Sequence, residues 1–366
     1  MEPFKNLYND TFFNGLTSVL SKTLKDFDKK QFLKKIYDKD WEARELKQRM
    51  KHIAETLHGF MPANYDIAVK QLYKIIDALR KEGKNGALEH MIFTEYVEKY
   101  GIDHYDTSME AIEFITQFIS CEFAIRPFII RYQAKAMKQM LKWSKHESFH
   151  VRRLSSEGCR PRLPWAMALP ALKKDPSTIL PILENLKDDP AEFVRKSVAN
   201  NLNDIAKDNV DIVLDLVKRW QGKSPRTDWI IKHGSRTLLR KANPQAMKLF
   251  GLAVADKVVV DKLKITDKSI GIGSTLLFAF ELTNKGDQPI KLRVEYGIDY
   301  VKSGGKASRK LFKITENIYQ PHKTVAFKRA QSFRNLTTRK HYAGVHTLSV
   351  VINGQELATK KFEVTE

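Results

Sequence analysis

The sequence predicts a mainly α-helical protein in which a solenoid of helix pairs is followed by a C-terminal β-sandwich. Apolar residues recur at helical spacing up to about residue 255, and short alternating runs separated by glycine and asparagine turns follow. A length of 366 residues is enough for two or three domains with a sizeable core. We therefore expect a helical domain over residues 1–255 and a sandwich domain over residues 259–366.

The first part of the helical domain predicts helices without a clear repeat. We expect helical structure from residue 17 to residue 57, broken mainly at residues 37–40. Residues 83–86 (GKNG) and 101–107 (GIDHYDT) have the composition of loops.

A weak internal repeat follows. The segments 149–158, 192–201 and 228–237 align without gaps, and their starts lie 43 and 36 residues apart. Helical stretches at 177–186 and 210–220 separate them, so paired helices recur at the period of a HEAT-like solenoid. In this register Arg152 matches Arg195, Arg153 matches Lys196, and Glu157 matches Asn200. We expect these second helices to line a concave surface.

Beyond residue 255 the pattern is typical of strands. The runs KLKIT, STLLFAFELTNKG, IKLRVEYGIDY, TVAFKRAQSF, HTLSVVINGQ and KKFEVT alternate apolar and polar residues. Asn353-Gly354 indicates a type I′ hairpin. Roughly seven short strands in about 105 residues predict a β-sandwich.

The composition indicates a polyanionic partner. The formal net charge is +20 with pI near 9.6, and Lys and Arg outnumber Asp and Glu on both sides of Val259. Nucleic acid is the first candidate and an anionic membrane surface the second. No apolar run approaches the ~18 residues that span a bilayer, and the N-terminus does not resemble a signal peptide. Cys121 and Cys159 form no framework, which suits a reducing cytosol without structural zinc.

The segment 151–165 (VRRLSSEGCRPRLPW) carries the strongest chemical signal. It predicts a helix that runs into a proline-broken turn, with Arg152, Arg153, Arg160 and Arg162 around Glu157 and Trp165. Arginines would hold a phosphate backbone while the carboxylate faces something cationic. The alternative for Trp165 is a core aromatic between helices; Trp143, Trp220 and Trp229 share that ambiguity, and Trp41 has only a core interpretation.

Two further carboxylates allow two interpretations each. Asp204, four residues after Asn200 and on the same helical face, is either a HEAT residue that caps a neighbouring turn or a functional acid. Glu122 lies in an otherwise apolar helix. It is either an ion-pair partner of Arg126 or a carboxylate facing a cleft.

One loop of the sandwich is dense in DNA-contacting residue types. It spans 332–346 and contains Arg334, Asn335, Thr337, Thr338, Arg339, Lys340, His341, Tyr342 and His346. Such a loop suits phosphate or minor-groove contacts, the alternative being a solvated basic loop. Residues 302–310 form a weaker candidate, a flexible basic loop. We find no phosphate-binding glycine loop, no HExxH, no GxSxG and no metal-ligand spacing, so we expect neither metal nor cofactor.

These residues together resemble the AlkC branch of the AlkC/AlkD alkylpurine DNA glycosylases. SCEF, VRRLSSEGCRPRLPW, VRKSVANNLNDIAKDN and FRNLTTRKHYAGVH carry the resemblance, which covers essentially the whole chain. It implies a HEAT-like solenoid that cradles double-stranded DNA, an Ig-like domain that helps to embrace it, and excision of cationic N-alkylated bases such as N3-methyladenine and N3-methylcytosine. It also implies that Glu122, Glu157 and Asp204 are the active-site acids and that Trp165 lies beside the lesion. The basic residues expected at the DNA are Arg152, Arg153, Arg160, Arg162, Lys196, Arg334, Arg339, Lys340 and His341.

An alkylated base already carries positive charge, so it leaves without protonation and the enzyme needs little general acid. The segment offers arginine and no lysine amine for a Schiff base, which predicts a monofunctional glycosylase. The rivals are a non-catalytic DNA-binding scaffold, a protein-interaction adaptor and a membrane-surface protein. We expect a monomer in the bacterial cytoplasm, associated with the nucleoid when bound to DNA.

Overall fold

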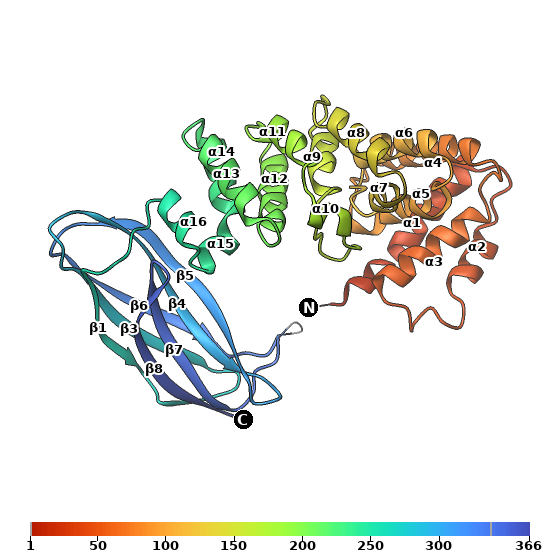
Figure 1. Cartoon of the computed structure of the whole chain (residues 1–366). Coiled ribbons are helices and arrows are strands. Elements are labelled where there is room, and N and C mark those ends of the chain that lie inside the picture. Colours follow the sequence, from red (N-terminus) through yellow and green to blue (C-terminus); the bar gives the residue numbers. More distant parts are fainter. Residues whose placement is uncertain (1, 337–338) are drawn as a thin grey trace. The chain divides into compact units, whose positions relative to one another are not determined.

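Helices fill the first two thirds of the chain and strands the last third, as predicted. A computed structural model describes residues 2–336 and 339–366, so Thr337 and Thr338 of the basic loop lie outside the described residues (Figure 1). The helices are η1 (Phe4–Leu7), α1 (Asp10–Thr23), α2 (Lys29–Ile36), α3 (Leu46–His58), α4 (Tyr65–Lys81), η2 (Leu88–Met91), α5 (Ile92–Tyr100), α6 (Tyr105–Thr116), α7 (Ile125–Arg131), α8 (Gln133–Trp143), α9 (Phe149–Glu157), α10 (Pro170–Lys174), α11 (Leu180–Leu186), α12 (Glu192–Ile205), α13 (Val210–Trp220), α14 (Pro225–Gly234), α15 (Arg236–Arg240) and α16 (Pro244–Leu249). The strands are β1 (Val258–Ile265), β2 (Ser269–Gly271), β3 (Thr275–Asn284), β4 (Ile290–Val301), β5 (Ala307–Tyr319), β6 (Thr324–Ser332), β7 (Gly344–Ile352) and β8 (Gln355–Thr365).

Packing divides the chain into two compact units. One comprises residues 1–209 and 220–234, and the other comprises residues 210–219 and 235–366. The second unit includes α15 and α16, although the predicted boundary near residue 255 groups them with the other helices. The reason is local: Lys291 of β4 donates to the carbonyl of Phe250 at 3.0 Å, and Asn353 donates to the carbonyl of Ala253 at 2.7 Å.

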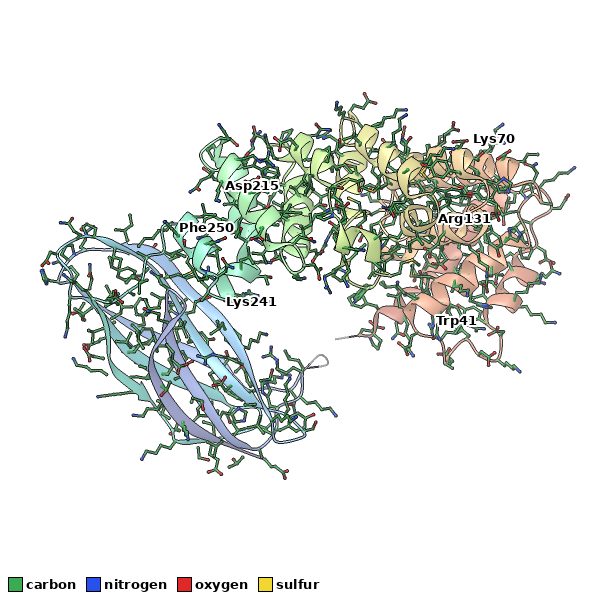
Figure 2. All side chains as sticks on the ribbon, viewed as in Figure 1. Trp41, Lys70, Arg131, Asp215, Lys241 and Phe250 are labelled. Carbon is green, nitrogen blue, oxygen red and sulfur yellow. The ribbon has the colours of Figure 1, made fainter. Side chains whose placement is uncertain are left out.

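The predicted interruptions of the N-terminal helices are found, with shifted bounds. α2 ends at Ile36 and α3 begins at Leu46, while a second break separates α1 from α2. Residues 83–86 form a loop, but α6 begins at Tyr105, so the second predicted loop is shorter than expected. Trp41, labelled in Figure 2, is buried as predicted.

The helices that contain the sequence repeat pack against one another in order along the chain. α9 packs on α12, and α12 packs on α14 (Figure 1). The first two aligned segments begin α9 and α12, and the third begins inside α14 and runs into α15. Arg152 and Arg195 make matching bonds: Arg152 donates to the carbonyls of His146 and Glu147, and Arg195 donates to those of Asp189 and Pro190. Each arginine thus closes the turn that precedes its own helix, as expected of a HEAT-like ladder.

The second unit contains a two-sheet sandwich. A three-stranded sheet has the order β1-β3-β6, and a five-stranded sheet has the order β2-β8-β7-β4-β5. Apolar side chains of both sheets form its core, including Phe280, Ile298, Phe333 and Leu348. Asn353 and Gly354 have φ of 47° and 82°, which confirms the predicted type I′ turn between β7 and β8. The prediction of a loop over residues 302–310 is wrong in part, since β5 begins at Ala307 and pairs along β4.

Candidate active site

The predicted site residues of the first unit come from three neighbouring elements. Glu157 is the last residue of α9, Asp204 lies in the last turn of α12, and Glu122 lies just before α7. Pro161 and Pro164 prevent α9 from continuing, so residues 158–169 form a loop that carries Arg160 and Trp165 past the end of the helix. Glycine at position 158 lets the end of α9 pack closely against α7 and α8, because a Cβ there would lie 2.6 Å from Ile125 Cγ2 and 2.9 Å from Met140 Cε.

Carboxylates and guanidinium groups alternate through the site. Arg160 Nη1 donates to Glu157 Oε1 at 2.7 Å, and Arg160 Nε donates to Asp204 Oδ2 at 2.9 Å. Arg153 donates to Glu122 and lies 3.6 Å from Glu157 Oε1. The structure thus brings together Glu122, Glu157 and Asp204, which are 35 and 47 residues apart in sequence, through two shared arginines.

The centre of this group is buried. Glu157 is 5% exposed, Asp204 1% and Arg160 7%. Burial works to lower the pKa of Arg160, but Glu157 and Asp204 outweigh it and hold the pKa above its ordinary value. Lys207, which the sequence did not single out, places Nζ 2.9 Å from Asp204 Oδ1 and is partly exposed.

Arg126 has a different role from the one that the sequence suggested. The alternative interpretation of Glu122 paired it with Arg126, but its partners are Arg153 and Ser120, whose hydroxyl donates at 2.6 Å. Arg126 is fully buried and donates to the carbonyls of Gly158, Arg160 and Met167 at 2.7–3.0 Å. Burial lowers its pKa to about 10.

Trp165 is not a core residue. It is 61% exposed, and its φ of 65° puts the backbone in the left-handed region, which is unusual for a bulky residue. Lys47 donates to its carbonyl, and the Phe4 ring lies edge-on with centroids 6.0 Å apart. Trp143 and Trp220 are buried, whereas Trp229 is exposed. The large, exposed ring of Trp165, in the loop that follows Glu157, is available to stack on a ligand.

Several arginines predicted at DNA phosphates have carboxylate partners within the protein. Arg152 pairs with Asp189 at 2.6 Å, and Arg162 pairs with Asp208 through two bonds of 2.6 and 2.9 Å. Arg153 and Arg160 pair as described above. Lys196 pairs with Glu192 one turn earlier and stays exposed. The turn-closing role of Arg152 and the burial of Arg160 run against the prediction that these two hold phosphates, because their donors are already directed at protein oxygens.

The basic loop of the sandwich is only partly exposed. Arg334 and Lys340 face solvent, and Arg339 lies over the Tyr300 ring at 5.2 Å. His341 is 6% exposed and packs against Phe333 with ring centroids 5.0 Å apart. Its burial is at odds with the predicted direct contact with DNA. A basic hollow of about 770 Å³ on the same unit, which the sequence did not indicate, is lined by Arg240, Arg309, Lys310, Lys313 and Arg329 with Tyr296, Leu311 and Phe312.

Within residues 2–336 and 339–366, no group of three or more His, Cys, Asp or Glu side chains is arranged to hold a metal ion. In the same residues no helix combines the length and apolarity needed to cross a bilayer.

Comparison with known proteins identifies the family of this chain. Residues 64–247 match the family described as DNA alkylation repair enzyme. The chain belongs to this family. Residues 259–366 match a second family, described as "Uncharacterised protein YhaZ, C-terminal Ig-like domain", so the sandwich is Ig-like, as the resemblance implied.

Two full-length relatives extend the match. The family member YhaZ of Bacillus subtilis (strain 168) is 44% identical over 365 residues, which covers all of both chains. The solved structure of the alkylpurine DNA glycosylase AlkC of Pseudomonas fluorescens, bound to DNA containing an abasic site analog, is 36% identical, with a TM-score of 0.95 and full coverage of both chains. These matches confirm the fold class and the resemblance to the AlkC branch.

Proposed function

We propose that this protein is a monofunctional DNA glycosylase that hydrolyses the N-glycosidic bond of cationic N-alkylated bases, with N3-methyladenine and N3-methylcytosine as its substrates. The observation that carries the proposal is the cluster of Glu122, Glu157 and Asp204, together with the exposed ring of Trp165 in the loop that follows Glu157. The full-length likeness to an alkylpurine glycosylase that was solved on DNA supports it. As part of the same proposal, the protein acts as a monomer on nucleoid DNA in a bacterial cytoplasm.

The residue types suit the chemistry of a charged leaving group. Alkylation at N3 makes the base a cation, so the bond to the sugar breaks without a general acid and the positive charge moves to an oxocarbenium-like sugar. Buried carboxylates stabilise that cation and orient the attacking water. Trp165 adds cation–π attraction of about 0.5–2 kcal/mol to the charged base.

A strand break through a Schiff base requires a neutral amine. Lys207 is the lysine bonded to the cluster, and its amine is held against Asp204 at 2.9 Å, where the ammonium form is paired and not nucleophilic. We therefore expect abasic DNA without nicking. Borohydride added during the reaction should trap no covalent complex; a trapped complex that disappears in Lys207→Met would contradict the monofunctional mechanism.

A second candidate function is a non-catalytic DNA-binding scaffold. It is favoured by the fact that Glu122, Glu157 and Asp204 all have protein partners, as carboxylates of a purely structural ladder would. The two candidates differ in what the loss of one carboxylate does, because a scaffold that loses a negative charge keeps or tightens its DNA binding.

The deciding experiment measures release of free base from duplex DNA that carries N3-methyladenine or N3-methylcytosine. Wild type is compared with Glu157→Gln at equal occupancy of the DNA. Glu82→Gln, which removes the same charge from an ion pair with Lys22 on the protein surface, is the matched control. We expect release by wild type and the control, and loss of at least ~100-fold in Glu157→Gln. Tight binding by wild type without release of either base would establish the scaffold.

A further inference from the structure

Arg160 occupies an unusual position for a basic residue in a DNA-binding protein. Its guanidinium lies between two carboxylates of different helices, bonded to Glu157 of α9 and to Asp204 of α12. The side chain is buried, and both partners are buried with it. Two donors of this guanidinium, Nε and Nη1, are therefore already bonded to carboxylates of the protein.

The backbone of Arg160 is also fixed. Arg126 of α7 donates to the carbonyls of Gly158 and Arg160 through Nη1 at 3.0 and 2.9 Å, and to the carbonyl of Met167 through Nε at 2.7 Å. These three acceptors span the loop that carries both Arg160 and Trp165. Because a fully buried arginine donates three hydrogen bonds to one loop through Nε and Nη1, that loop is a preorganised part of the site.

Charged side chains on or next to α7, α9 and α12 lie around Arg160. They are Glu157 and Arg153 on α9, Asp204 and Lys207 at the end of α12, Arg126 on α7, and Glu122 just before α7. Like charges held close together in a buried site disfavour each other's ionisation, and a guanidinium shared between them reverses that effect.

We propose that Arg160 is a positioning residue of the active site, which orients the carboxylates of Glu157 and Asp204 toward the sugar, and that it does not bind phosphate. The inference rests on the proposed glycosylase function and deepens it. A cationic transition state is stabilised only by carboxylates that are charged when it forms, so Arg160 acts on the reaction through these two groups.

The test compares Arg160→Met and Arg160→Lys with Arg131→Met. Arg131, labelled on α7 in Figure 2, forms an exposed ion pair with Asp103, so its loss removes the same charge away from the acidic cluster. Single-turnover base release is measured from pH 5 to pH 9, together with the dissociation constant for duplex DNA containing an abasic-site analog at two salt concentrations.

We expect Arg160→Met to release base ~100-fold more slowly at pH 7 than wild type, with the dissociation constant changed less than ~3-fold. Arg160→Lys restores the charge but not the two-sided geometry and should fall between wild type and Arg160→Met. If Arg160→Met does not fold, the test rests on Arg160→Lys alone. Its rate of base release should then be lower than that of wild type, with the dissociation constant changed less than ~3-fold.

Two results would overturn the inference. One is a ~10-fold or larger loss of DNA affinity with a reduced salt slope and an unchanged rate for the bound lesion, which identifies a phosphate ligand. The other is a rate of base release in Arg160→Lys that is no faster than in Arg160→Met, because a residue that positions the carboxylates should be partly replaced by another cation. Failure of wild type to release base is a separate outcome, which defeats the proposed function itself.

Discussion

Gly158→Ala tests whether the close approach of α9 to α7 and α8 positions the site. A Cβ at residue 158 would lie 2.6 Å from Ile125 Cγ2, 2.9 Å from Met140 Cε and 3.1 Å from the carbonyl of Leu154. The first two distances are shorter than any normal carbon contact, so both side chains must move. Extra atoms in a packed core cost about 1–3 kcal/mol. The glycine has a helical φ of −64°, so alanine recovers about 0.4–1 kcal/mol from the unfolded chain.

From the midpoints of these ranges, about 2 and about 0.7 kcal/mol, the net loss is about 1.3 kcal/mol, which lowers Tm by about 3–5 °C for a unit of this size. Gly15→Ala is the matched control, because Gly15 lies inside α1 and its Cβ would meet nothing nearer than Lys84 Cε at 4.0 Å. Alanine is the better helix former there and should raise Tm by about 1–4 °C.

Thermal unfolding followed at 222 nm, where helices dominate the signal, measures both changes. Base release by Gly158→Ala at equal DNA occupancy should also fall about 10-fold, since the carbonyl of residue 158 accepts a bond from Arg126 and Glu157 is its neighbour. A Gly158→Ala protein as stable as wild type would refute the packing argument. A destabilised protein with full activity would refute the link between this contact and the site.

Two further predictions concern exposed and buried groups of the first unit. Trp165→Ala should release cationic base about 2- to 30-fold more slowly than wild type in single-turnover assays, whereas Trp165→Phe keeps a ring and loses less; equal losses in the two would exclude a role for the aromatic face. Burial raises the pKa of Cys159 to about 12, so native protein at pH 8 should not react with iodoacetamide at this residue until it unfolds. Because the pKa of Cys159 in the folded protein lies above its ordinary value of 9.0, its contribution to folding stability is complete below pH 9 and is lost as the pH rises toward 12. Cys159→Ala should therefore reduce the fall of Tm between pH 9 and pH 12. An unchanged fall of Tm would contradict the raised pKa of Cys159.

Much of the fold could be predicted because local patterns carry it. The repeat of segments 149–158 and 192–201 reappears in the matching carbonyl contacts of Arg152 and Arg195, and Asn353-Gly354 forms the turn that its residue types favour. β5 was missed because its first residues after Ala307 are small or charged and burial does not alternate regularly along this edge strand, so it lacks the period-2 pattern of a half-buried strand.

The sequence predicted which residues make up the site, but not which of them contact one another. The segment around Glu157 concentrated charge visibly, but nothing local distinguishes an arginine that faces solvent from one that bridges two carboxylates. The sequence indicated Arg126 only as a partner of Glu122 and did not indicate Lys207, since their partners in the structure are loop carbonyls and an aspartate brought close only by the fold. His341 belongs to a basic loop by sequence and to the core by packing.

The sequence by itself determined the helical repeats, the sandwich, the positive charge and the set of acids and arginines from which a site could be built. Only the tertiary structure decided which acid each arginine neutralises, that Trp165 is exposed, and that the loop after Gly158 is held by Arg126. The physical reason is range: hydrophobic periodicity and turn preferences act between neighbours in the chain, whereas ion pairs and burial depend on groups that meet only when α7, α9 and α12 pack together.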